Sequence, residues 1–214
     1  MPSTARPRRS QDEVERAKRS ILEAALELFN VQTYDQVSMR KVAARAGYSP
    51  AAIYNYYRNK DALYLDVLQT GFQILLDTFR AAIDLERPVE SLREMVRLLY
   101  AFSLKHPAYY DLMFTLPVPK YLDYVGTELE QVALNEKVIA ETNLRLAEEV
   151  ITAGVEKGVF SPAAGAPLAA LAVLAAAHGV ISLNRSKVLV ELGLEGEAAY
   201  AAVMGQVLDR LLGL

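Results

Sequence analysis

Apolar side chains recur along most of this chain at the spacing of a helix. In residues 11–31 they stand three, four or seven positions apart with Lys and Glu between them, which predicts an amphipathic first helix. No segment alternates apolar and polar residues as a half-buried strand does. The pattern therefore predicts an all-α fold.

Two short helices joined by a tight turn are predicted after the first helix. Ser38 is a good N-cap for a second helix through Arg45, and Gly47 can take the left-handed conformation that ends a helix. Ser49 and Pro50 then begin a third helix, with Ser as the N-cap and Pro in the first turn. Two helices joined by a three-residue turn form a helix-turn-helix.

The rest of the chain is predicted to be helical as well. Asn59 caps a long helix that runs to about Asp84, before Pro88 forces a break. Further helices are expected at about residues 89–105, 108–115, 125–157, 163–190 and 196–213. The predicted domains are a disordered basic tail (1–10), a helix-turn-helix domain (11–58) and a helical second domain (59–214).

Positive charge is concentrated in the first 60 residues. Residues 1–60 hold 11 Lys and Arg against 6 Asp and Glu, whereas residues 61–214 hold 12 against 20. These charges of +5 and −8 add to the net charge of −3, and the basic end predicts a polyanionic partner. Arg6, Arg8 and Arg9 supply part of the excess, either as an arm that enters a DNA minor groove or as a solvated tail.

The sequence lacks the usual motifs of catalysis and metal binding. The absence of cysteine excludes disulfides and thiolate metal sites. His106 and His178 are the only histidines, neither lies in an HExxH motif, and there is no GxSxG motif or phosphate-binding glycine loop. We therefore expect no enzymatic activity, no metal and no cofactor.

One segment, residues 162–184, is uncharged and long enough to span a bilayer. Alanine dominates it, and Pro, Gly and His interrupt it, which favours a buried interface helix over a transmembrane helix. Charged residues rather than an apolar stretch follow the basic amino terminus, so no export signal is expected. We expect a cytoplasmic location and no membrane partner.

The run VSMRKVAARAGYSPAAIYNYYRNKDAL, preceded by ALELFNVQTYD, resembles the amino-terminal DNA-binding domain of the TetR family of transcriptional regulators. The resemblance covers roughly residues 16–68. It implies a three-helix DNA-binding domain, whose third helix is the recognition helix, followed by a helical ligand-binding and dimerisation domain. Two sites depart from the family pattern: Thr33 stands where glycine is usual, and Tyr56 and Tyr57 stand where a His-Phe pair is common.

This resemblance implies a sequence-specific regulator, a repressor that a small apolar or aromatic effector releases from a palindromic double-stranded DNA operator. The alternative is a ligand-independent architectural DNA-binding protein. That protein would differ by showing no ligand-dependent change in DNA affinity.

The third helix carries more tyrosine than one helical face can bury. Ile53 and Tyr57 lie one turn apart and share the buried face, with Tyr56 at its margin, whereas Tyr54 and Asn55 point away. A phenol can donate to a phosphate oxygen, and an asparagine can pair with an adenine edge. Tyr54 is therefore expected to grip the DNA backbone, and Asn55 to read a base.

Other candidates surround this helix. The Ala51 methyl can touch a thymine methyl, and Ser38 and Ser49 either present free N–H groups to phosphate or serve only as caps. Lys60, like Tyr54, matches a phosphate-contact position of the family. The predicted DNA-binding residues are Ser38, Arg40, Ser49, Pro50, Ala51, Tyr54, Asn55, Tyr56 and Lys60.

Aromatic residues are concentrated between residues 100 and 124, where they form either ordinary core or the wall of an effector pocket. His178-Gly179 resembles part of the Trp-His-Gly type of TetR ligand-binding domain, although the chain has no tryptophan. His178 is thus either a pocket group or a hydrogen-bonded core histidine. The predicted ligand-binding residues are Tyr100, Ser103, His106, Tyr109, Tyr110, Met113, Phe114, Tyr121, Tyr124 and His178.

The last two helices are predicted to form a homodimer interface. Small residues follow a near-heptad spacing that allows helices to approach closely, and leucines near the carboxyl end add bulk. These residues are Ala169, Ala172, Ala176 and Gly179, with Leu208, Leu211 and Leu212. A two-fold dimer requires a roughly palindromic operator. The alternative is that one chain buries both helices in its own core.

Overall fold

The computed structural model describes residues 10–213, which contain helices and no strand. The α-helices are α1 (Gln11–Val31), α2 (Met39–Ala46), α3 (Pro50–Ile53), α4 (Lys60–Arg80), α5 (Pro88–Lys105), α6 (Pro107–Tyr110), α7 (Glu130–Glu156), α8 (Gly165–Arg185), α9 (Val188–Glu191) and α10 (Gly196–Leu212). Two 3-10 turns (Tyr34–Gln36 and Tyr121–Tyr124) and one π-helical turn (Asp111–Thr115) complete the set. The all-α prediction is confirmed, while the arginines predicted as an arm lie outside the described residues.

The chain divides into two compact units. The head unit comprises the residues up to Leu68 together with Asp111–Leu134, and the body unit comprises Gln69–Tyr110 and Asn135–Leu214. Helices α4 and α7 each contribute residues to both units. The middle segment of the chain thus packs with the amino-terminal helices rather than with the helices that flank it in sequence.

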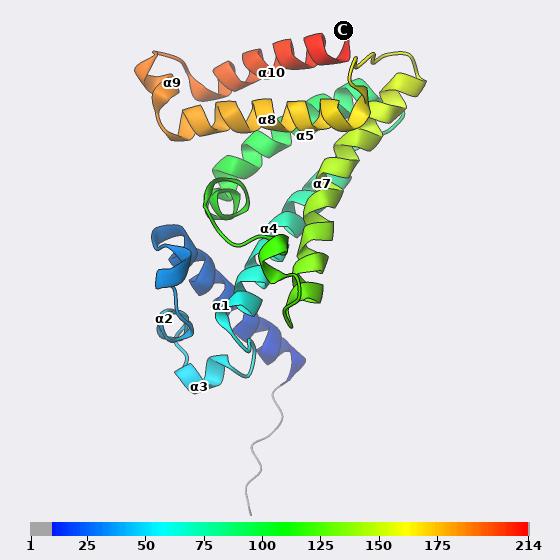
Figure 1. The fold of residues 1–214 in the computed structure, drawn as a ribbon. Coiled ribbons are helices and arrows are strands. Elements are labelled where there is room, and N and C mark those ends of the chain that lie inside the picture. The colour runs from blue at the N-terminus through cyan, green and yellow to red at the C-terminus, as the bar shows by residue number, and fades with distance from the viewer. Residues whose placement is uncertain (1–9, 214) are drawn as a thin grey trace, which may run out of the picture. The chain divides into compact units, whose positions relative to one another are not determined.

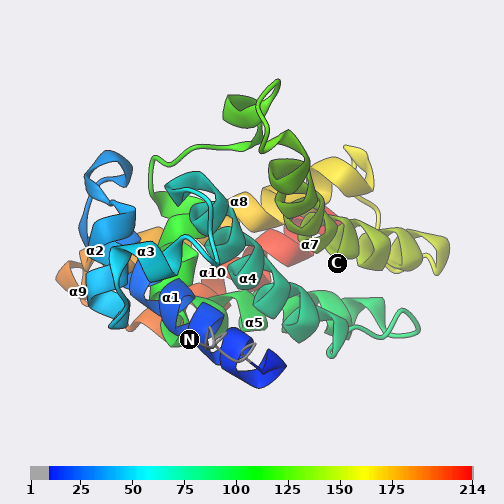
Figure 2. The same cartoon turned by 90° about the horizontal axis from the view of Figure 1, so that it is seen from below.

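Local signals set the helix ends of the head unit. Ser10 forms a capping box with Glu13 at the start of α1, and the Ser38 hydroxyl accepts the Lys41 N–H at 3.3 Å at the start of α2. Gly47 ends α2 with φ of 76°, a left-handed conformation that favours glycine. The chain then turns sharply, so that the short α2 and α3 lie next to each other (Figure 2).

An apolar core holds the head helices together. The α1 face that the helical spacing predicted is buried, and it packs on α2 and on the π-helical turn of the middle segment. The fully buried side chains here include Ile21, Ala25, Val42, Ala43, Ile53 and Leu63. Tyr64 adds a polar tie, because its hydroxyl donates to the Pro119 carbonyl at 2.9 Å.

Helices α5, α8 and α10 form the centre of the body unit, with α10 lying along α8 (Figure 1). The predicted helix over 163–190 is broken, because Lys187 takes a left-handed conformation with φ of 66° between α8 and α9. Ala169 and Leu208, predicted at a dimer interface, are 4% and 2% exposed and pack within their own chain. The side chains of Leu211 and Leu212 lie outside the described part.

One face of α8 remains exposed, and it includes Gly179 of the predicted interface residues. It carries Leu168, Leu171, Ala175 and Gly179, without a charged residue among them. By length and composition alone α8 is apolar enough to cross a membrane, and a third of its most apolar window is buried. An exposed apolar face of this kind is typical of an interaction site.

Candidate functional site

The segment after α3 projects two polar side chains from an anchored turn. Ile53 is fully buried and Tyr57 is 5% exposed, so both fix the segment to the head core. Tyr54 is 55% exposed and Asn55 is also exposed, while Tyr56 is half-buried and packs edge-on against Tyr48 with ring centroids 6.3 Å apart. The faces agree with those predicted, although regular helix ends at Ile53 and a turn carries the rest.

The start of α3 presents a small, open surface. The Ser49 hydroxyl accepts the Ala52 N–H at 3.2 Å, so it works as a helix cap. Pro50 and Ala51 are exposed beside it. The surface can therefore approach a flat partner closely without moving a large side chain.

Most basic side chains around this surface are already engaged. Lys41 donates to the Gln32 amide oxygen at 2.8 Å and to the Gln36 carbonyl at 2.7 Å. Arg45 donates to Glu27 at 2.6 Å. Arg40, in contrast, is exposed and forms no hydrogen bond or ion pair with any described residue. Its guanidinium is available to an external anion.

Lys60 lies in a polar cluster at the start of α4. Its ammonium donates to the Tyr34 carbonyl at 2.8 Å and lies 4.0 Å from the centre of the Tyr34 ring. The Tyr34 phenol donates to Asp61. Burial, followed by the hydrogen bond to Asp61, raises the pKa of Tyr34, so the phenol remains a donor. The cluster holds Lys60 at the edge of the exposed surface.

The predicted ligand residues are divided between the two units. Met113, Phe114, Tyr121 and Tyr124 belong to the head unit, and the other six belong to the body unit. Tyr124 and Met113 are buried, whereas Phe114 and Tyr121 are half-buried. The structure therefore gathers the set into two groups.

In the body unit a polar network joins several of these residues. The Tyr110 hydroxyl lies 2.8 Å from His178 Nδ1, and the Arg185 guanidinium lies 5.8 Å from the Tyr110 ring centre. Arg185 also donates to the Ser103 carbonyl at 3.2 Å. Burial, with the nearby charge of Lys105, lowers the pKa of His106.

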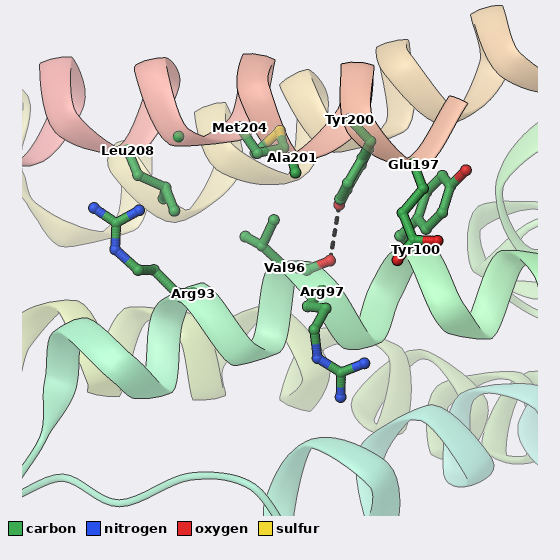
Figure 3. A pocket seen from close by; sticks show the side chains of 10 residues that line it. Arg93, Val96, Arg97, Tyr100, Glu197, Tyr200, Ala201, Met204 and Leu208 are labelled. Atoms are coloured by element: carbon green, nitrogen blue, oxygen red, sulfur yellow. Dashed lines mark hydrogen bonds between the residues drawn. The ribbon is translucent and has the colours of Figure 1, made fainter. Parts of the chain in front are cut away.

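A surface groove of about 280 Å³ lies between α5 and α10 (Figure 3). The lining residues include the apolar Val96, Met204 and Leu208, the phenol Tyr200, and the charged Arg93, Arg97 and Glu197. Tyr100 is the one predicted ligand residue that lines it, and the Tyr200 hydroxyl donates to the Val96 carbonyl at 2.8 Å. The groove falls just below the roughly 300–1,000 Å³ of typical small-molecule sites.

Two buried polar residues of α7 were missed by the sequence predictions. Glu136 and Asn143 are each 7% exposed. Asn143 Nδ2 donates to the carbonyls of Phe72 and Ile139 at 3.2 and 2.9 Å, while its Oδ1 is buried without a hydrogen-bond partner among the described residues. Their seven-residue separation, which puts both on the apolar face of a helix, was a usable signal. No cluster of three or more possible metal ligands occurs in residues 10–213.

Two domain families match different parts of the sequence. "Bacterial regulatory proteins, tetR family" matches residues 21–67, and "Tetracyclin repressor-like, C-terminal domain" matches residues 92–207. The chain belongs to the TetR family of transcriptional regulators. It is a DNA-binding regulator, and the exposed surface around α3 lies within its matched DNA-binding domain.

Individual relatives agree with this assignment. The HTH-type transcriptional repressor NicS of Pseudomonas putida is 22% identical over 149 residues, which cover 69% of this chain and 68% of NicS. PfmR, a TetR family regulator of Thermus thermophilus, shares the fold with a TM-score of 0.70 at 21% identity, over 88% of this chain and 97% of PfmR. SmeT in complex with triclosan gives 0.69 at 16% identity, over 92% of each chain.

Proposed function

We propose that this TetR family regulator is a repressor that binds a palindromic operator as a homodimer and releases it when a small apolar or aromatic molecule binds its body. The observation that carries the proposal is the exposure of Tyr54 and Asn55 on a segment whose neighbours Ile53 and Tyr57 are fixed in the core. Rigidly held polar side chains can grip phosphate and read base edges. The remaining predicted contacts, including Arg40 and Lys60, surround them.

The exposed face of α8 supports a homodimer. A second copy of the same face would cover Leu168, Leu171 and Ala175 without burying a charge. A side chain at Gly179 would meet no atom within 4 Å, so the partner helix can approach closely there. A two-fold dimer would present two recognition segments to successive major grooves of an inverted repeat.

The aromatic residues and α4 support a ligand response. His106, Tyr109 and Tyr121 are only half-buried, which leaves ring surface for a ligand. Helix α4 runs from Lys60 to Arg80 and contributes residues to both the head and the body unit. A ligand that favours one α4 position by about 1–3 kcal/mol would change DNA affinity about 5- to 150-fold. The complex of SmeT with triclosan is a precedent for such a ligand in a protein of this fold.

Selection from random DNA duplexes tests the proposal, with the salt concentration fixed because phosphate contacts make affinity depend on it. The selection is expected to enrich an inverted repeat that two chains bind. The protein is expected to lie in the cytoplasm, where its operator lies. Failure to enrich any inverted repeat contradicts operator recognition. An operator whose affinity no small molecule changes would favour the architectural alternative.

A further inference from the structure

A part-buried hydrogen bond ties the recognition segment to α4. The Tyr57 hydroxyl donates to Asp66 Oδ2 at 2.6 Å. Tyr57 lies two residues after Asn55 in the exposed pair Tyr54 and Asn55, whereas Asp66 lies in the second turn of α4. The bond therefore joins the end of the segment that follows α3 to helix α4.

Packing alone does not require the Tyr57 hydroxyl. A phenylalanine would fill the same volume, but apolar contact is non-directional and does not by itself set the orientation of the ring. A phenol buried to 5% exposure needs a hydrogen-bond partner, and here the partner is a carboxylate. The bond to this charged acceptor fixes both the distance and the direction of the ring relative to α4.

The donor role of Tyr57 is secure over the physiological pH range. Burial, followed by the hydrogen bond to Asp66, raises the pKa of the Tyr57 phenol, and the nearby charge of Glu15 on α1 acts in the same direction. The phenol therefore stays protonated and donates. The hydrogen bond to Asp66 is therefore not lost through deprotonation of the phenol in this pH range.

We propose that Tyr57 and Asp66 are positioning residues that hold Tyr54 and Asn55 in the orientation needed to read the operator. The inference rests on the proposed function, because it assumes an operator. Tyr57 and Asp66 themselves do not touch DNA; they set where the reading side chains stand relative to α4.

The test measures the specificity ratio, defined as the dissociation constant for a scrambled duplex divided by that for the selected operator of the same length. Tyr57→Phe and Asp66→Leu should each lower the ratio about three- to tenfold, the range expected for loss of one such hydrogen bond. Asp66→Asn should keep it near the wild-type value, because the amide oxygen still accepts the phenol proton. A fall in the folded fraction weakens both affinities equally and leaves the ratio unchanged.

Tyr200→Phe is the matched control. It removes another buried phenol hydrogen bond, to the Val96 carbonyl in the body unit, and should lower stability without changing the ratio. If the wild-type protein is selective and neither Tyr57→Phe nor Asp66→Leu changes the specificity ratio, the positioning role is wrong, whereas the proposed function stands. A wild-type protein that binds the two duplexes equally defeats the proposed function itself.

Discussion

The Tyr110 hydroxyl lies 2.8 Å from His178 Nδ1 and so joins α6 to α8 inside the body unit. Tyr110→Phe would remove this part-buried hydrogen bond while keeping the ring, which is 1% exposed. We predict that Tyr110→Phe lowers the free energy of unfolding by about 0.5–1.5 kcal/mol, measured by urea denaturation. In a double-mutant cycle with His178→Phe, the two changes should be coupled; strictly additive effects would show that the contact contributes nothing.

Lys60 is predicted to exchange its contact with Tyr34 for a DNA phosphate. Lys60→Met keeps the apolar stem but removes the charge, so it should weaken binding to all duplexes and reduce the slope of log affinity against log salt by about one. Titrations at several salt concentrations measure this slope. Lys137→Met is the control, because it removes a positive charge that pairs with Glu141 on α7. A Lys60→Met slope equal to that of the wild type would limit Lys60 to a structural role.

Tyr54 and Asn55 are predicted to have different roles despite being neighbours. Tyr54→Phe removes only a hydroxyl and should weaken binding by about two- to tenfold on every sequence, because phosphate contacts carry no base information. Asn55→Ala should instead relax the preference at one base pair by about 1–3 kcal/mol. Repeating the duplex selection with each variant separates the two effects. The reverse pattern would exchange the assigned roles.

The helix ends of the head unit could be predicted because each depends on one or two neighbouring residues. Ser38 and Ser49 cap their helices, and Gly47 takes the left-handed conformation, as local rules require. The buried pair Ile53 and Tyr57 followed equally from helical spacing. These features need no knowledge of the rest of the fold.

Features that depend on distant contacts could not be predicted in the same way. The middle segment packs in the head unit through long-range ties, such as Arg58 to Glu128 at 3.1 Å, whose pairing has no local signal. The break at Lys187 places a non-glycine residue in a left-handed conformation, against the usual preference. The partner of the exposed α8 face could not be predicted either, because helical periodicity identifies faces but not their partners.

The dimer proposal predicts a large effect from one surface change. Leu171 is 49% exposed on the uncharged face of α8, so Leu171→Glu should bury an unpaired carboxylate between the two copies. The dimer dissociation constant should rise about tenfold or more, as measured by analytical ultracentrifugation. Leu104→Glu, at a position 54% exposed on α5, is the matched control and should leave the constant unchanged. Equal behaviour of the two variants would place the interface elsewhere.

His106 predicts how stability responds to acid. Burial, with the charge of Lys105, lowers the pKa of His106 below its ordinary value of 6.5, so the folded chain binds this proton less readily than the unfolded chain. The contribution of neutral His106 to the free energy of unfolding is therefore fully present above about pH 6.5. It is lost as the pH falls from there through the pKa of His106 in the folded chain. Urea denaturation at pH 7.5 and 5.5 should show a smaller loss for His106→Gln than for the wild type. His178→Gln provides the comparison for the other histidine, and an identical loss in His106→Gln and wild type would mean that His106 does not contribute to the acid response.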